Sequence, residues 1–223
     1  FIRHHKEGPF FCYAPWTPPH GSYQIPESDP AWPMYKDKPW PRNAKVAAAM
    51  DSMVDRQVGE LMVLLAELEI DERTVVFFCS DNGASERFEG SLDSSGVLRG
   101  RKRSMYEGGI RVPLVARWPG MIAPGQVSDH PCSFADVMPT LAEIAGVSSY
   151  VPGDADGLSI VPTLCSKPDR QKKHAFMYWE WHVYDWGERR FVPNGLMQAV
   201  RMGDWKTVRH KSDRPFELYD LSK

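Results

Sequence analysis

A long amphipathic stretch followed directly by a short apolar run limits the folds open to this chain. From Ala44 to Ile70, apolar side chains recur at steps of three and four residues, which predicts a helix with one apolar face. Asn43 precedes this stretch and is the expected N-cap residue. The next run, Thr74–Cys79, is β-branched and aromatic without polar alternation. Such a run is typical of a strand that is covered on both faces of a parallel sheet.

A second strand is expected before the helix, and the order of elements then predicts the fold class. Pro9–Ala14 is apolar and aromatic, which indicates a buried strand, and a proline-rich loop joins it to the helix. Strand, loop, helix and strand together form a βαβ unit. Residues 110–117 add another strand, and residues 134–145 a short helix that Gly146 ends. We therefore expect an α/β fold containing part of a doubly wound, mostly parallel sheet with flanking helices.

The C-terminal part of the chain has a different pattern, with short apolar runs separated by turns. These runs lie at residues 176–181, 197–202, 205–209 and 216–219. Gly203-Asp204 suits a hairpin turn between two of them. We therefore predict a small antiparallel sheet in residues 171–223, after an α/β domain in residues 1–170.

Composition excludes several classes of function. A formal net charge of −2 gives no general attraction to nucleic acid or to an anionic membrane. No apolar run approaches the roughly 20 residues that span a bilayer. The four cysteines show no zinc-type spacing. The chain begins at Phe1 without a methionine and runs into a basic segment, so we expect it to be an internal piece of a longer protein.

The most prominent polar feature is Asp81-Asn82, within Ser80–Gly83 and directly after the predicted strand Thr74–Cys79. Ligands of open α/β sheets bind beyond the carboxyl ends of the strands. Asp81 and Asn82 offer oxygen ligands, the type that Ca²⁺ or Mg²⁺ requires. A plain turn is the alternative, since Asn-Gly is a common turn pair.

Two further residues have side chains suited to catalysis. His20 follows the first predicted strand, and an imidazole can donate a proton to a leaving group near neutral pH. Lys102 lies within residues 83–109, a long loop rich in glycine, serine and charge, and could hold a sulfate or phosphate oxygen. The alternatives are a surface histidine and a solvated basic run. A nucleic-acid patch around Lys102 is disfavoured, because the run lacks an aromatic partner and the chain is acidic overall.

Taken in order, these segments resemble the sulfatase family of the alkaline phosphatase superfamily. The most specific stretch is Leu98–Pro113, with the sequence LRGRKRSMYEGGIRVP, followed by Trp118-Pro119-Gly120. The other matching segments are Pro9–Phe11 with Pro19–Gly21, Met50–Asp55 with Val58-Gly59, Thr74–Gly83, Asp136–Leu141, Asp156–Ser159 and Glu217–Leu221. The resemblance covers nearly the whole chain.

The resemblance implies a role for each candidate residue. Asp81 and Asn82 are expected to bind a divalent metal, most often Ca²⁺ in this family, with Mg²⁺ as the alternative, and Asp81 also to steer the nucleophile. Lys102 is expected to contact the substrate sulfate, and His20 to assist the leaving alcohol. The expected substrate is a sulfated small molecule or glycan. A periplasmic or secreted location is suggested by the family resemblance alone.

One family motif has no counterpart in this chain. The family nucleophile is a formylglycine made from Cys or Ser in a C/S-x-P-x-R motif, and no cysteine here is followed by x-Pro-x-Arg. The resemblance places this motif, two aspartates of the metal site and a further lysine and histidine in an N-terminal part. We therefore expect a fragment that is inactive alone.

Three hypotheses for the parent protein follow. The first is a sulfatase that hydrolyses sulfate monoesters. The second is a phosphodiesterase or phosphonate monoester hydrolase of the same superfamily. The third is a non-catalytic relative that binds sulfated glycans. Four aromatic residues of the C-terminal part are candidates for sugar stacking, with packing of the small sheet as the alternative: Trp179, Trp181, Tyr184 and Trp186.

Overall fold

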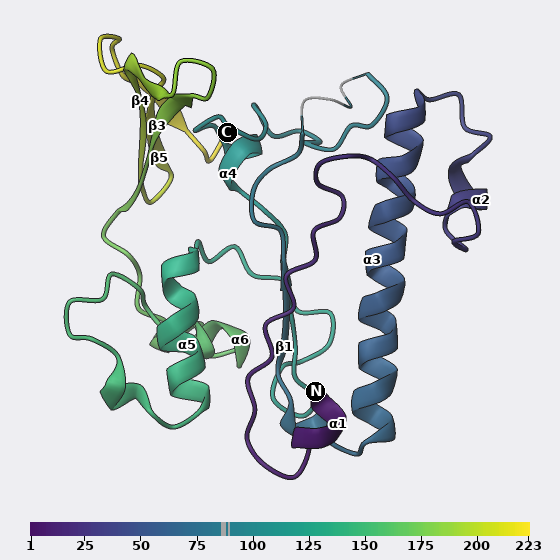
Figure 1. Cartoon of the computed structure of the whole chain (residues 1–223). Helices are drawn as coiled ribbons and strands as arrows, with labels where there is room; N and C mark the ends of the chain where they lie inside the picture. The colour runs from purple at the N-terminus through teal and green to yellow at the C-terminus, as the bar shows by residue number, and fades with distance from the viewer. Residues whose placement is uncertain (86–87, 89) are drawn as a thin grey trace. The chain divides into compact units, whose positions relative to one another are not determined.

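The computed structural model describes residues 1–85, 88 and 90–223 (Figure 1). The chain divides into two compact units. The first contains Phe1–Val76 and Ala84–Gly96, and the second contains Phe77–Gly83 and Val97–Lys223. Part of the long loop predicted at residues 83–109 lies outside the described residues, namely 86, 87 and 89. The predicted boundary near residue 170, between an α/β domain and the small antiparallel sheet, stays a prediction.

The main element of the first unit is helix α3, Arg42–Glu67, which confirms the helix predicted from residue 44 onward. Its buried face includes Val46, Met50 and Leu65. The N-cap residue is Pro41 rather than Asn43, which lies in the first turn. Proline has no backbone N–H and a fixed φ, so a helix can begin directly after it. At the other end Glu69 has φ of 56°, a left-handed conformation that stops the helix.

The remaining elements of the first unit are short. They are α1, Ile2–His5; α2, Trp32–Tyr35; and the 3₁₀ helix η1, Asp71–Arg73. The proline-rich loop is packed against α3, because Tyr23 and Trp40 contact a buried cluster that contains Ala44, Ala47 and Phe88. The rings of Tyr23 and Phe88 meet edge to face, with 5.0 Å between their centroids.

The strand predicted at Pro9–Ala14 is wrong for this structure. The segment belongs to no sheet, and Phe11 and Tyr13 are 70% and 78% exposed. A β-strand is defined by hydrogen bonds to a neighbour, and none of the described residues forms a ladder with this segment. The segment is apolar, but an apolar pattern alone does not supply the partner strand that would bury it.

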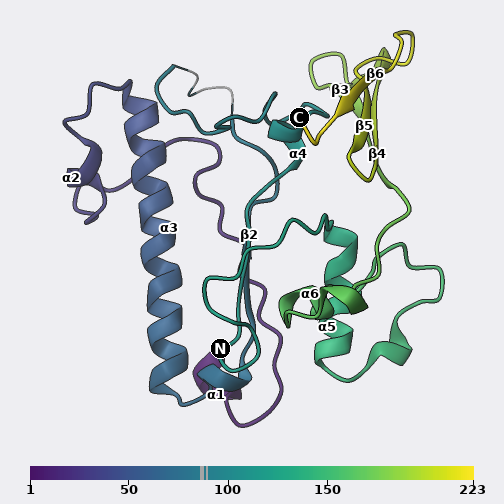
Figure 2. The ribbon, with the colours of Figure 1, turned by 180° about the vertical axis from the view of Figure 1, so that it is seen from behind.

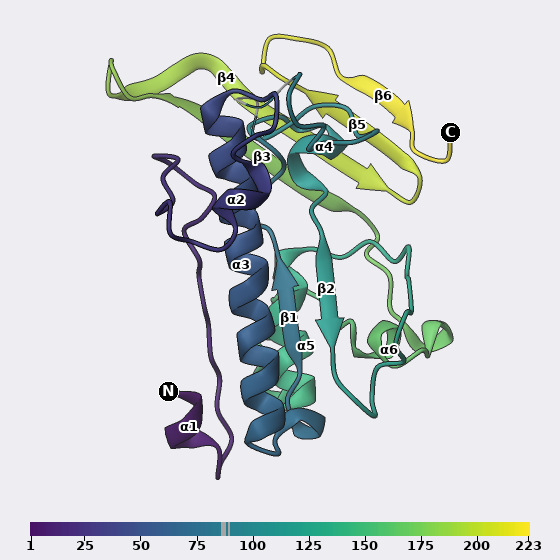
Figure 3. The ribbon, with the colours of Figure 1, turned by 90° about the vertical axis from the view of Figure 1, so that its right-hand side faces the viewer.

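Strand β1, Val76–Cys79, belongs to the second unit from Phe77 onward and pairs with β2, Leu114–Arg117, beside which it lies in Figure 3. The strand predicted at residues 110–117 therefore starts late, because Glu107–Ile110 forms the short helix α4. Phe78 is 40% exposed, so β1 is not covered on both faces as predicted. The faces of a sheet are covered by helices or a second sheet packed on them, and an apolar run does not by itself supply that cover.

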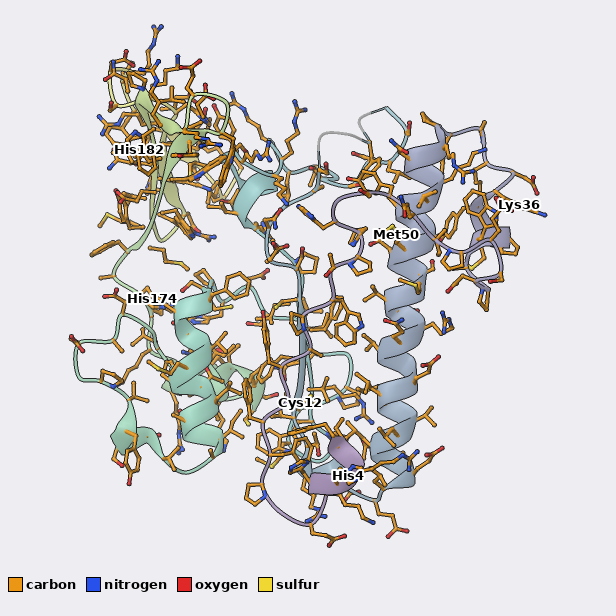
Figure 4. All side chains as sticks on the ribbon, in the orientation of Figure 1. His4, Cys12, Lys36, Met50, His174 and His182 are labelled. Atoms are coloured by element: carbon orange, nitrogen blue, oxygen red, sulfur yellow. The ribbon has the colours of Figure 1, made fainter. Side chains whose placement is uncertain are left out.

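A group of short helices follows β2. The 3₁₀ helix η3, Phe134–Asp136, leads into α5, Val137–Ile144, and Gly146 with φ of 72° ends the helix as predicted. Asp136 is 1% exposed and accepts hydrogen bonds from the backbone N–H of Ser133 at 2.7 Å and from His174 Nε2 at 2.8 Å (Figure 4). The other short helices are η4, Ser148–Tyr150; α6, Val161–Leu164; and η5, Pro168–Arg170.

The predicted antiparallel C-terminal sheet is confirmed (Figure 2). Its strands are β3, Met177–Asp185; β4, Arg190–Met202; β5, Trp205–Arg209; and β6, Glu217–Asp220, hydrogen-bonded in chain order. Gly203, with φ of 58°, turns β4 into β5. Met105, Met197, Ala199 and Val208 form the buried core under this sheet. The α/β class with a small antiparallel sheet is therefore confirmed.

Candidate functional site

Asp81 and Asn82 lie at the end of β1, as the sequence predicts. Asp81 is exposed and Asn82 is half-buried, so their oxygens can reach a ligand. Ser80 Oγ donates a hydrogen bond of 2.9 Å to the backbone oxygen of Asn82, which shapes the turn. Burial and the carboxylate of Asp81 raise the pKa of the Cys79 thiol.

The turn after β1 is fixed by backbone packing against the Gly108-Gly109 pair of α4. The N–H of Gly83 donates to the oxygen of Gly109 at 3.0 Å. A Cβ added to Gly83 would lie 1.9 Å from the oxygen of Gly108, so no other residue fits there without moving backbone. Gly83 therefore does more than permit a turn, because it lets the backbone after β1 contact the backbone of α4.

The loop that carries Lys102 packs against the same glycine pair. The N–H of Gly108 donates to the oxygen of Arg99 at 2.8 Å, and a Cβ on Gly108 would lie 2.1 Å from the oxygen of Gly100. A turn closed by Ser104 N–H to the oxygen of Arg101, at 2.9 Å, contains Lys102, which is half-buried. The segments of Asp81-Asn82 and Lys102 therefore share one backbone support. We call Gly83, Gly100, Gly108 and Gly109 the glycine core.

His20 lies in the first unit. Its backbone N–H donates to the oxygen of Thr17 at 2.9 Å, in a turn that contains the cis Pro18–Pro19 bond, and the residue is exposed. The predicted strand before it is absent, so the argument that placed His20 at the carboxyl edge of a sheet does not hold here. Its role rests on the family resemblance.

The sequence reasoning missed the residues that hold α4 in place. Lys206 Nζ on β5 donates to Glu107 Oε1 at 2.6 Å, and the two side chains are 2% and 15% exposed. Tyr106 OH donates to Glu217 Oε2 at 2.7 Å, and Arg99 Nη1 donates to Tyr219 OH at 2.6 Å. One signal was available. Lys206 stands two residues before the apolar Val208, and alternate residues of a strand share a face.

The donor chemistry of Asp81 and Asn82 fits a hard divalent cation, but two side chains do not complete a site. Ca²⁺ takes six to eight oxygen ligands and Mg²⁺ takes six. Within the described part of the chain, no group of three His, Cys, Asp or Glu residues could hold a metal ion. The chain therefore offers part of an oxygen ligand set.

The four aromatic candidates in and after β3 separate into two groups. Trp179 and Trp181 pack against the core of the C-terminal sheet, which agrees with sheet packing rather than sugar stacking for these two residues. Tyr184 contacts Trp186 and Phe191 with ring centroids 4.9 Å and 5.3 Å apart, and Trp186 is 84% exposed. A stacking role for Tyr184 and Trp186 stays a prediction.

Comparison with known proteins decides the family. The sulfatase family model matches residues 1–147, and a model of the C-terminal part of N-sulphoglucosamine sulphohydrolase matches residues 100–223. The chain belongs to the sulfatase family. No helix in the described ranges is long and apolar enough to cross a membrane.

Individual sulfatases match over most of this chain. The steryl-sulfatase of Mus musculus is 32% identical over 217 residues, which cover 93% of this chain and 31% of that protein. A sulfatase of Formosa agariphila is 34% identical over 237 residues, which cover 99% of this chain and 41% of that protein. The chain therefore spans less than half the length of these relatives.

Solved structures share the fold. The structure of Ps i-CgsB in complex with k-i-k-neocarrahexaose superposes with a TM-score of 0.73 at 26% identity, covering 92% of this chain and 42% of that one. A phosphonate monoester hydrolase of Silicibacter pomeroyi superposes with a TM-score of 0.61 at 22% identity, covering 81% of this chain and 35% of that one. The second likeness concerns the fold alone. These neighbours agree with the predicted membership of the alkaline phosphatase superfamily.

Proposed function

We propose that the complete protein is a sulfuric ester hydrolase that cleaves sulfate monoesters with a divalent metal, and that this chain supplies part of its site. The observation that carries the proposal is the glycine core. It supports the metal-ligand candidates Asp81 and Asn82 and the sulfate-binding candidate Lys102 through the same backbone contacts. A shared rigid support is what a site needs when a metal and a cation must meet one substrate group.

Each residue has a role that its chemistry allows. Asp81 and Asn82 present oxygens at the end of β1 and bind the metal, which Ca²⁺ suits best and Mg²⁺ second. When bound, a divalent cation polarises a sulfate oxygen and stabilises negative charge. Lys102 holds a further sulfate oxygen and balances charge as the S–O bond breaks. His20 donates a proton to the leaving alcohol oxygen.

The nucleophile lies outside this chain in the proposal. The family resemblance implies a formylglycine from a C/S-x-P-x-R motif, and the 223 residues contain no such motif at a cysteine. We expect the chain alone to be inactive, because removal of a nucleophile costs about six orders of magnitude in turnover in a well-studied hydrolase. Measurable sulfate-ester hydrolysis by the pure 223-residue chain would contradict this part of the proposal.

The experiment that tests the function uses the complete reading frame, produced where formylglycine can form, with calcium present. Hydrolysis of para-nitrophenyl sulfate is compared with that of para-nitrophenyl phosphate. We expect turnover of the sulfate ester, and loss of that turnover in Asp81→Ala and Lys102→Ala. Lys223→Met is the control, because Lys223 is 82% exposed in a surface pair with Asp220 and should leave activity unchanged.

A second candidate is hydrolysis of phosphodiesters or phosphonate monoesters. The fold shared with a phosphonate monoester hydrolase supports it, and a metal with a lysine serves phosphate as well as sulfate. Preference for the phosphate ester in the assay above would favour it. Binding of sulfated glycans without catalysis is the third candidate, and absence of the C/S-x-P-x-R motif from the complete reading frame would support that.

The substrate class follows from the sulfatase proposal. A sulfated small molecule or a sulfated glycan is consistent with relatives that include a steryl-sulfatase and with a neighbour solved with a carbohydrate. A periplasmic or secreted location is part of the same proposal and rests on family resemblance.

A further inference from the structure

The pair of Lys206 and Glu107 is buried and close, which is costly for two charged groups. The Lys206 side chain is 2% exposed, and its Nζ lies 2.6 Å from Glu107 Oε1. Burial lowers the pKa of Lys206, and the hydrogen bond with Glu107 opposes that shift. Lys206 Nζ also lies 5.6 Å from the centre of the Trp179 ring. Two apolar residues of similar size often stabilise a fold as well as a buried ion pair does, so stability alone does not account for it.

The pair is attached to the glycine core. Glu107 is the first residue of α4, and Gly108 and Gly109 follow it directly. A Cβ on Gly109 would lie 2.2 Å from the oxygen of Ser104 and 2.7 Å from that of Arg101. A shift of Glu107 therefore moves the glycine pair, and with it the turn that holds Lys102.

Two further polar contacts run from the C-terminal sheet to the same loop. Tyr106 is hydrogen-bonded to Glu217 of β6, and Arg99 is hydrogen-bonded to Tyr219. The guanidinium of Arg99 lies 4.1 Å from the centre of the Tyr106 ring, and its side chain is 62% exposed. The Arg99 side chain is exposed to solvent, whereas the Lys206 side chain that contacts Glu107 is buried. Glu217 is 42% exposed, whereas Lys206 and Glu107 are 2% and 15% exposed, so the contact of Lys206 is the most buried of the three.

We propose that Lys206 is a positioning residue, which fixes Glu107 and the glycine core and thereby holds Lys102 where it meets the substrate sulfate. The role of Lys102 rests on the proposed function, whereas the positioning of the loop does not. The C-terminal sheet is then a support for the site in addition to any role in substrate recognition.

Hydrogen exchange of the complete protein tests the positioning directly. The readout is the exchange rate of a peptide that covers residues 99–110, with a peptide over α5, residues 137–144, as the internal reference. We expect Lys206→Met to speed exchange in residues 99–110 by about tenfold or more and to leave the reference unchanged. Lys223→Met, which removes a surface charge from the same unit, should change neither peptide.

The double variant Lys206→Met with Glu107→Gln separates positioning from stability. It leaves no unpaired buried charge, so its melting temperature should recover most of the loss caused by Lys206→Met. Exchange in residues 99–110 should nevertheless stay fast, because the directional bond is absent. Slow exchange in the double variant would show that the pair serves stability only and would overturn the proposal.

Kinetics provide a readout that a purely structural role would not move. Lys206→Met should lower kcat/KM for para-nitrophenyl sulfate by about 10- to 100-fold. In a Lys102→Ala background the same change should lower it by a clearly smaller factor, because the part of the loss that arises through Lys102 is already absent. Equal losses in both backgrounds would overturn the proposal. If the wild-type protein hydrolyses no sulfate ester, the proposed function fails, and the exchange experiment still decides the positioning.

Discussion

Three segments carry the candidate site residues of this sulfatase chain, and the first differs from the other two in how it is held. Residues 9–21, which contain His20, form no sheet and leave Phe11 and Tyr13 exposed. Residues 80–83 and 97–110 are held by backbone hydrogen bonds, by the close contacts of the glycine core and by the buried pair of Lys206 and Glu107. A site segment can thus keep its geometry without regular structure, provided that neighbours within the same unit support its backbone.

The largest effect is expected from breaking the buried pair. Lys206→Met leaves Glu107 charged and 15% exposed without its partner, so the free energy of unfolding should fall by about 3 kcal/mol or more. Arg3→Met is the matched comparison, since Arg3 pairs with Glu67 at 3.1 Å with both side chains more than half exposed, and its cost should stay below about 1 kcal/mol. Urea unfolding measures both. Equal costs would remove the distinction between the buried and the exposed pair.

A glycine substitution tests the second element of support. Gly108→Ala places a Cβ 2.1 Å from the oxygen of Gly100, and we expect a loss of about 2–3 kcal/mol by urea unfolding and loss of sulfate-ester turnover. Gly59→Ala in α3 is the matched control, because its Cβ meets nothing within 4 Å and helix propensity should raise stability by about 0.5–1 kcal/mol. A tolerated Gly108→Ala would contradict the close packing of the glycine core.

The segment of His20 should respond weakly to truncation. Phe11 is 70% exposed, so Phe11→Ala in the 223-residue chain should change the free energy of unfolding by less than about 0.5 kcal/mol. Val208→Ala, at a fully buried position of β5, should cost about 2 kcal/mol in the same chain. A Phe11→Ala cost close to that of Val208→Ala would show that residues 9–21 are packed as firmly as the glycine core.

The smallest effect concerns pH. Hydrogen bonds from Tyr219 and Tyr106, with the charge of Arg99, lower the pKa of Glu217. A carboxyl whose pKa is lowered by folding adds stability that is present above its unfolded pKa of 4.5 and is lost as the pH falls through its folded value. Glu217→Gln should therefore cost less than about 1 kcal/mol near neutral pH, and the difference from wild type should shrink in acid. A constant difference across this range would contradict the assignment.

The sequence predicts elements well where a segment carries its own pattern. Helix α3 and the four strands of the C-terminal sheet form close to their expected positions, because apolar periodicity and the Gly203 turn are local signals. Pro9–Ala14 has an equally clear apolar pattern but forms no strand, since pairing depends on a neighbour that the local pattern does not contain. Asn43 fails as the N-cap because Pro41 starts the helix two residues earlier.

The candidate site divides in the same way. Asp81 and Asn82 could be placed from the sequence because they directly follow β1. The support of Lys102 by Lys206 joins residues about a hundred positions apart. A single lysine in a strand gives no local signal that it pairs with a buried residue such as Glu107. Family resemblance supplied the roles of these residues, and the structure adds how their segments are held.

The most direct test of the central claim is whether Asp81 and Lys102 act as one unit in sulfate-ester hydrolysis by the complete protein. Asp81→Asn and Lys102→Ala should each lower kcat/KM for para-nitrophenyl sulfate by about a thousandfold or more, and the double variant should lose little beyond the worse single variant. Losses that multiply in the double variant would mean that the two residues act independently. Full turnover in either single variant would contradict the proposed site.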